Sequence, residues 1–179
     1  MSFQKAGFFV LSLVLLNLPG FPTESYGSPS DQVFREEMKG MIRKLSSSLL
    51  DPLSKNDRQA LQTSLNGIVS ETEKRGRPIR FGIGILDTEG LAIAGRYIVG
   101  TFKEEDFSRY HFLKKAFKQK KVILDRLFFQ NRSEFLVICV PLVQKNEVIG
   151  ALVLGFDPAE IKREYGLTAE QFMALDFNR

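Results

Sequence analysis

Apolar residues recur at helical spacing near the start of the chain. They stand three or four positions apart, so they share one face of a helix. The residues on this face are Phe34, Met38, Met41, Leu45 and Leu49. A side-chain oxygen of Ser30 or Asp31 can cap the first turn. We expect Asp51-Pro52 to interrupt the helix, because proline lacks a backbone N–H and disfavours a helical residue before it.

A second amphipathic stretch follows after a short polar segment. Its apolar positions are Leu61, Leu65, Ile68 and Val69. Ser54 or Asp57 is a start signal, and Lys74-Arg75-Gly76 gives the cation-then-glycine ending of a helix. Packing against a core explains both apolar stripes.

From Pro78 onward the hydrophobic period changes to two, which predicts strands. Phe81, Ile83 and Ile85 alternate along the first strand. Residues 87–90 form a tight turn that ends in glycine, and residues 91–97 return as a second strand. The two strands make a hairpin.

The next part of the chain predicts one helix and three more strands. The helix runs from about Asp106 to Gln119, and the strands cover 122–129, 135–143 and 148–156. Residues 135–143 are apolar on both faces, which indicates a central strand. Pro141 implies a bulge or a strand end there. In the last strand, we expect the backbone to approach a neighbour closely at Gly150 and Gly155.

Short turns at 131–134 and 145–147 join these strands, and turns this short connect antiparallel neighbours. Two short helices, 159–165 and 168–175, close the chain, and Thr168 and Gln171 fit a capping box. The sequence therefore predicts an α+β fold. One antiparallel sheet of about five strands carries a long N-terminal helical segment and a crossing helix.

The first 27 residues have the pattern of a secretory signal peptide. Lys5 precedes an apolar run over residues 7–18, and Ser25 and Gly27 are small residues before a cleavage point. The run is shorter than the roughly 20 residues of a membrane-spanning helix. The mature protein is therefore expected to be periplasmic or secreted. The alternative is an uncleaved leader that tethers it to the membrane.

Two units are expected along the chain. Residues 1–27 are the signal peptide, and residues 28–179 are one domain, in line with the length of 179 residues. Within the domain, a helical lead-in covers 31–76, the sheet core covers 78–157, and the C-terminal helices cover 158–177.

Composition and charge exclude several classes of protein. The chain is 44% hydrophobic and 26% charged, which is typical of a folded domain. The net charge of +4 is mild and the basic residues are spread along the chain, which argues against nucleic-acid binding. The single cysteine, Cys139, lies in an apolar run and is interpreted as a small buried hydrophobe.

The sequence does not indicate an enzyme. It contains no identifiable nucleophile–base pair, phosphate-binding loop or metal-ligand set, and His111 is its single histidine. We therefore expect no catalytic residues, no bound metal and no cofactor.

Four features resemble the Cache domain, the extracytoplasmic PAS-like sensor domain. The amphipathic N-terminal helix leads directly into the sheet, and residues 87–90 are similar to the family's D-x-x-G turn. Residues 106–116 resemble the Asp-x-Ser-x-Arg-x-Tyr-Phe pattern of the family's crossing helix. Residues 140–157 resemble its closing strands. The sequence departs from the pattern between Ser108 and Arg109, where the spacing is one residue short, and at His111, where an aromatic residue is usual.

The resemblance covers residues 31–165 and implies a sensor of a small ligand held between the sheet and the crossing helix. It places Arg109, Tyr110 and His111 at the wall of that site. Further candidates are Arg96, Tyr97, Arg126 and Asp157. Because a guanidinium fork matches two carboxylate oxygens, the expected ligand is a small organic acid or amino acid. Asp157 would hold the amine of an amino acid.

The resemblance also implies a partner. Most Cache domains pass their signal to a kinase or chemoreceptor module, so a membrane-bound signalling protein is the expected partner. The N-terminal helix is a candidate surface for a homodimer.

Two other functions remain open at this point. One is a PAS-like protein–protein interaction module with no small ligand, in which Phe128, Phe129 and Phe135 plug the site. The other is a cytoplasmic dynein-light-chain-like (roadblock) domain, against which the leader argues.

Overall fold

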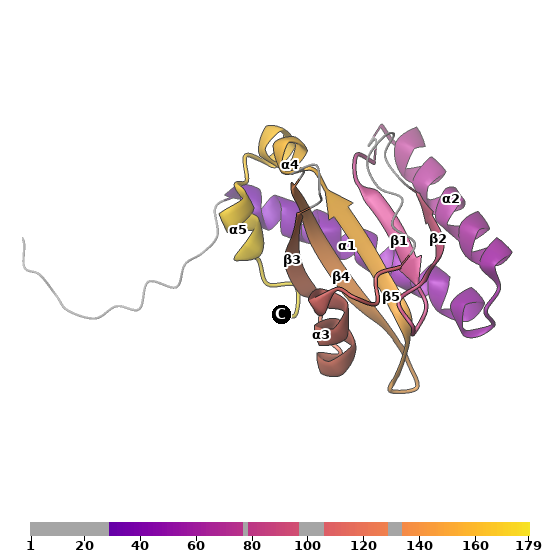
Figure 1. The fold of residues 1–179 in the computed structure, drawn as a ribbon. Helices are drawn as coiled ribbons and strands as arrows, with labels where there is room; N and C mark the ends of the chain where they lie inside the picture. The colour runs from indigo at the N-terminus through magenta and orange to yellow at the C-terminus, as the bar shows by residue number, and fades with distance from the viewer. Residues whose placement is uncertain (1–28, 77–78, 97–105, 129–133) are drawn as a thin grey trace, which may run out of the picture.

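A computed structural model describes residues 29–76, 79–96, 106–128 and 134–179. Five strands form one antiparallel sheet in the order β2-β1-β5-β4-β3, which confirms the predicted α+β class (Figure 1). In chain order the elements are α1 (Pro29–Ser54), α2 (Arg58–Lys74), β1 (Gly82–Leu86), β2 (Ala92–Arg96), α3 (His111–Gln119), β3 (Ile123–Phe128), β4 (Glu134–Gln144), β5 (Glu147–Phe156), α4 (Pro158–Tyr165) and α5 (Ala169–Met173).

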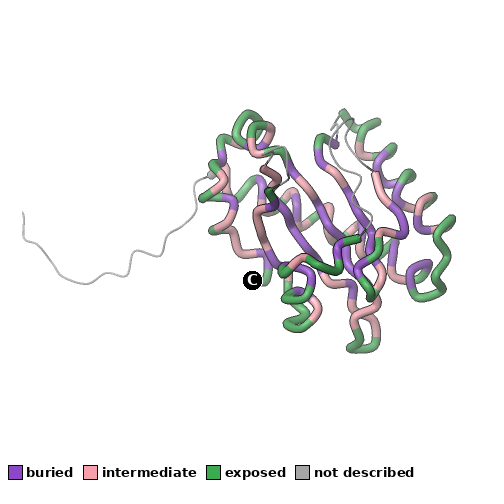
Figure 2. The backbone as a smooth tube through the Cα atoms, in the orientation of Figure 1, coloured by how far each residue is buried: buried purple, intermediate pink, exposed green. Residues whose placement is uncertain are grey.

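Helices cover the two faces of the sheet unequally. α1 lies across one face, with α2 beside β2, whereas α3 lies on the other face near the ends of β3 and β4 (Figure 1). The larger core joins α1, α2, α4 and α5 to the first face, and a smaller core joins α3 to the second. We call these the α1 face and the α3 face. Most of β4 and β5 is buried, as a central position requires (Figure 2).

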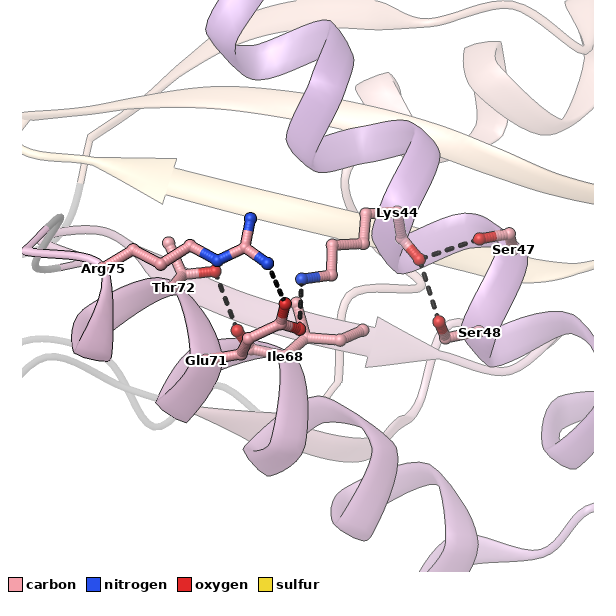
Figure 3. A network of polar contacts seen from close by, with 7 residues as sticks. All are labelled: Lys44, Ser47, Ser48, Ile68, Glu71, Thr72 and Arg75. Atoms are coloured by element: carbon pink, nitrogen blue, oxygen red, sulfur yellow. Dashed lines mark hydrogen bonds and ion pairs between the residues drawn. The ribbon is translucent and has the colours of Figure 1, made fainter.

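Polar contacts fasten α2 to α1 (Figure 3). The Glu71 carboxylate of α2 accepts hydrogen bonds from Lys44 Nζ of α1 and from Arg75 Nη2, each at 2.5 Å. The hydrogen bond from Lys44 and the nearby positive charges hold the pKa of the Glu71 carboxyl below its ordinary value. These residues are solvent-exposed, so they orient the helices more than they stabilise them.

The structure corrects the predicted limits of the first helix. α1 begins at Pro29, so Ser30 and Asp31 lie in its first turn instead of capping it. It also continues through Pro52 to Ser54. A proline this close to a helix end removes one backbone hydrogen bond, and Pro52 and Leu53 are both buried. The second helix is as predicted, with the Asp57 side chain accepting from Ala60 N at 2.9 Å.

Pro141 lies within β4, which continues to Gln144. The pairing of β4 with β3 ends at Cys139, so the missing N–H of Pro141 interrupts no bond to that strand. The predicted irregularity occurs just beyond it, between Leu142 and Val143. Thr168 and Gln171 form the predicted capping box of α5.

The two glycines singled out in β5 differ. A Cβ at Gly150 would lie 2.3 Å from the carbonyl oxygen of Leu86, which confirms the predicted close approach. A Cβ at Gly155 would meet no atom within 4 Å, so the same prediction was wrong there. The reason is that Gly155 faces a part of the sheet that the described helices leave uncovered.

Candidate functional site

The register of the strands builds two rows of residues on the α3 face. Residues directly opposite each other in an antiparallel pair project to the same side of a sheet. The first row is Ile123, Cys139, Val153, Gly84 and Gly95. The second row is Asp125, Val137, Gly155 and Gly82. In both rows, the residues from β3 and β4 have side chains, and the residues from β1 and β2 are glycines. The central strand β5 contributes Val153 to the first row and Gly155 to the second.

Four glycines therefore form a bare strip of backbone across β5, β1 and β2, which we call the glycine floor. Its members are Gly82, Gly84, Gly95 and Gly155. A Cβ at Gly82 or Gly84 would meet its nearest atoms at 3.8–4.0 Å, which is ordinary contact, and one at Gly155 would meet none. The local packing therefore does not require glycine at these three positions. A bound molecule that approaches the backbone closely would require it.

Aromatic side chains lie in the α3-face core, which also contains Val153, the neighbour of Gly84 in the first row. Phe107 and Phe112 are fully buried in the α3-face core, and Tyr110 packs against that core. The centre of the Tyr110 ring lies 5.5 Å from the centre of the Phe112 ring, with the two rings nearly parallel, and 5.8 Å from the centre of the Phe107 ring. These contacts fix the orientation of the tyrosine.

The turn before α3 positions Arg109 and Tyr110. Asp106 Oδ1 accepts from Ser108 N at 2.8 Å, and Tyr110 N donates to the carbonyl oxygen of Phe107 at 3.0 Å. Because Asp106 draws the chain into this turn, α3 begins at His111 and not at Asp106 as predicted. The hydrogen bonds from the side chain and backbone of Ser108 lower the pKa of the Asp106 carboxyl. The turn is therefore held by an ionised carboxylate.

A backbone hydrogen bond connects the turn before α3 to the hairpin of β1 and β2. Phe107 N donates to the carbonyl oxygen of Gly90 at 2.8 Å. Gly90 has a φ of +91°, and a Cβ there would lie 2.9 Å from Ser108 N. The D-x-x-G turn is thus built to receive the turn that carries Arg109 and Tyr110.

Arg109 and Tyr110 act together as a polar unit. Arg109 Nη2 donates to Tyr110 Oη at 3.2 Å, and its guanidinium carbon lies 5.1 Å from the centre of the tyrosine ring. Arg109 is exposed and Tyr110 is half-buried. The pair offers a cationic fork and a hydroxyl beside the aromatic residues of the α3-face core.

Asp125 was missed by the sequence analysis. It is the single charged side chain in the two rows of described residues on the α3 face, and it is half-buried. One of its carboxylate oxygens accepts from Arg126 N at 2.8 Å. The signal was present in the sequence: among the alternate positions 123, 125 and 127, which share one face of the strand, Asp125 is a carboxylate between the apolar Ile123 and Leu127.

The other candidates have other places or lie outside the described residues. Arg126 projects to the α1 face, where it lies 3.0 Å from Glu170 and 3.6 Å from Glu134. Arg96 pairs with Glu73 of α2 at 2.8 Å. Asp157 is the exposed cap of α4 and accepts from Ala159 N at 2.8 Å. His111 is exposed at the first position of α3, and Tyr97 lies outside the described residues.

The three phenylalanines expected to plug the site have different places. Phe128 pairs across the strand with Glu134 and is 70% exposed, so it plugs nothing. Phe129 lies outside the described residues. Phe135 is half-buried and packs against the α3-face core.

Other chemistry is sparse in the part of the chain that the structure describes. No group of three or more histidine, cysteine, aspartate or glutamate side chains is placed there to hold a metal ion. Cys139 is buried beneath α3, and burial raises the pKa of its thiol above the ordinary range. No helix over those residues has the length and apolar character needed to cross a bilayer.

Comparisons with known proteins place the fold. No family model and no curated protein matches the sequence. Among solved structures, the extracellular domain of the histidine kinase vpHK1S-Z8 superimposes with a TM-score of 0.57, at 17% identity over 79% of this chain. The ligand-binding domain of the Pseudomonas aeruginosa PAO1 chemoreceptor PctB, in complex with L-Arg, gives 0.54 at 17% identity over 83%.

This chain has the Cache fold. The domain of the Pseudomonas fluorescens chemoreceptor CtaA bound to L-isoleucine superimposes with a TM-score of 0.53, at 10% identity. This chain spans 54–57% of the three Cache-fold chains. At these identities the likeness establishes the architecture alone.

Proposed function

We propose that this chain is an extracytoplasmic sensor domain that binds a small carboxylate, with amino acids as the best-fitting class. The observation that carries this proposal is the glycine floor, where a Cβ at Gly82, Gly84 or Gly155 would meet no atom beyond its chain neighbours closer than 3.8 Å, on the face that carries Tyr110 and Asp125. The proposed ligand lies over this floor, on the α3 face.

Each polar group has a part in binding. The Arg109 fork takes the carboxylate, and the Tyr110 hydroxyl adds a hydrogen bond. Asp125 takes the ammonium group, in place of Asp157, whose oxygen already caps α4. An amino acid presents both charges, and the solved neighbours named above include complexes with L-Arg and L-isoleucine.

The location and the partner follow from the leader and the fold. The apolar run at residues 7–18 directs the chain out of the cytoplasm, with cleavage after residue 27 or retention as an anchor. The signal then passes to a membrane-bound protein, as the kinase and chemoreceptor neighbours suggest.

A thermal-shift screen of the full chain against amino acids and small carboxylates tests the proposal. A ligand at a hundredfold excess over its dissociation constant stabilises the folded state by about 2.7 kcal/mol. The shift is expected to be lost in Arg109→Ala and kept in Arg43→Ala, which removes an exposed arginine of α1. If Arg109→Ala binds as well as the wild type, this site assignment is rejected.

One observation favours a second function, a protein-interaction module without a small ligand. Phe128 is 70% exposed at the edge strand β3, where a partner can cover it. If no compound shifts the wild-type protein, this second function is preferred, and capture of a membrane partner that depends on Phe128 is the next measurement.

A further inference from the structure

The helix α3 carries an unusual concentration of positive charge. Five lysines and no acid lie between His111 and Lys121, whereas the whole chain has a net charge of +4. The rest of the chain therefore has a net charge of −1. The basic residues are thus not evenly spread, contrary to the expectation from composition.

These lysines face outward together. Phe112, Leu113 and Ala116 are the buried side of α3, and Lys114, Lys115 and Lys118 are exposed. Lys121 is also exposed just after the helix. One surface of the domain is therefore lined by ammonium groups.

A second segment extends the same surface. Lys120 Nζ donates to the carbonyl oxygen of Asn146 at 2.7 Å, which fixes the β4–β5 turn against the end of α3. Lys145, next to Asn146 in this turn, is exposed as well. We call Lys114, Lys115, Lys118, Lys121 and Lys145 the lysine surface.

Helix stability does not explain this charge. Some helical cations elsewhere in the described chain pair with acids one turn away, as Lys39 does with Glu36 in α1 and Arg163 with Glu160 in α4. The members of the lysine surface have no ion pair with a described residue. Like charges four positions apart, such as Lys114 and Lys118, destabilise a helix. Lys114 also lies in its first turn, where the helix dipole disfavours cations, and only Lys118 lies in the last turn, where the dipole favours them.

We propose that the lysine surface binds the anionic headgroups of a phospholipid membrane. Lysine ammonium groups are hydrated point charges that suit a diffuse layer of anions, and clusters of four to eight basic residues are typical of such binding. A specific acidic protein favours the arginine fork, and α3 contains no arginine. No exposed phenylalanine or tyrosine lies among these lysines in the described residues, which disfavours single-stranded nucleic acid.

This inference is independent of the proposed ligand. The lysine surface is the outer side of α3, and the proposed ligand lies over the glycine floor on the sheet. Lipid binding would hold the sensor domain against the membrane, near the expected signalling partner.

Co-sedimentation of the full chain with vesicles tests the proposal. The vesicles are phosphatidylcholine alone or phosphatidylcholine with phosphatidylglycerol. Any binding by the apolar leader occurs on both, so the difference between them reports the lysine surface. We expect at least about tenfold tighter binding to the anionic vesicles at about 0.05 M salt, and loss of the preference at about 0.5 M.

The decisive variant combines Lys114→Gln, Lys115→Gln, Lys118→Gln and Lys121→Gln. Its matched control combines Arg43→Gln, Arg58→Gln, Lys74→Gln and Lys162→Gln, which removes the same charge from exposed helical positions elsewhere. The first variant is expected to bind both kinds of vesicle equally, and the control to keep most of the preference. Lys145→Glu is expected to weaken binding of the protein to the anionic vesicles, and it leaves the sequence of α3 unaltered.

Three results would overturn the proposal. One is a wild-type protein without preference for anionic vesicles, and another is an equal loss in the variant and its control. The third is lysine-dependent binding to soluble polyglutamate that is tighter than binding to vesicles, which would assign the surface to an acidic protein. A ligand-induced thermal shift that persists in the four-lysine variant would keep the two proposals separate.

Discussion

Asp125 and Arg126 are neighbours in β3, and their side chains lie on opposite faces of the sheet. Asp125 shares a row with Val137 and Gly155 on the α3 face. Arg126 reaches Glu170 of α5, 3.0 Å away, on the α1 face. The alternation of a β-strand thus places one charge beside the glycine floor and directs the next away from it.

This alternation predicts a contrast between two substitutions. Asp125→Asn is expected to weaken amino-acid binding by about tenfold or more, because a hydrogen bond to a charged group contributes about 1.5–3 kcal/mol. Arg126→Gln removes ion pairs with Glu134 and Glu170 on the opposite face of the sheet and is expected to leave ligand affinity unchanged. Isothermal titration of both variants with the best ligand of the screen measures the difference. Equal losses would remove Asp125 from the site.

Filling the glycine floor is expected to abolish ligand binding without unfolding the protein. A Cβ at Gly155 meets no atom within 4 Å, and valine is favoured over glycine in a strand. Gly155→Val should therefore have a melting temperature equal to or above that of the wild type, with no ligand-induced shift. Retention of the full shift would show that the ligand does not lie over this part of the sheet.

Gly150, five residues earlier in β5, is expected to behave in the opposite way. A Cβ there lies 2.3 Å from the carbonyl oxygen of Leu86 and 2.9 Å from Leu53 Cδ2. Gly150→Ala should lower the free energy of unfolding by about 1–3 kcal/mol, because the strand and the end of α1 must move apart. Urea unfolding measures the loss. Gly155→Ala is the matched control, and a similar loss in both variants would contradict the contact at Gly150.

Asp106 is expected to act on ligand binding through the turn that it holds. Asp106→Ala leaves Ser108 N without its acceptor, so Arg109 and Tyr110 lose their fixed positions and affinity should fall several-fold. Asp106→Asn keeps an acceptor oxygen and should have a smaller effect. Titration of both variants with ligand distinguishes a role of the turn from a general loss of charge.

The pH dependence of this effect has a definite sign. Because the pKa of the Asp106 carboxyl is lowered from 3.8 in the folded state, its contribution is present above 3.8 and is lost as the pH falls through the folded value. The difference in affinity between wild type and Asp106→Ala should therefore be constant from about pH 5 to about pH 8. A difference that disappears within this range would contradict an ionised Asp106 as the holder of the turn.

Most elements could be predicted from the sequence because their signals are local. The helical stripe from Phe34 to Leu49, the D-x-x-G turn at 87–90 and the Thr168–Gln171 capping box depend on residues close together in the chain. The resemblance of residues 106–116 to a family pattern also located Arg109 and Tyr110 on the α3 side. Local chemistry misled where packing overrode it, as at Pro52, which burial keeps inside α1.

What the sequence alone did not determine is which residues meet across the sheet. Gly82, Gly84, Gly95 and Gly155 come from three strands, and only the antiparallel register brings them into one floor. The same register puts Asp125 beside this floor and turns Arg126 away from it. Tertiary packing likewise places Arg96 within ion-pair distance of Glu73, and Asp157 forms the N-terminal cap of α4. The sequence determined the elements and the fold class, because helix and strand periods are local, and tertiary structure alone decided the face that each charge occupies.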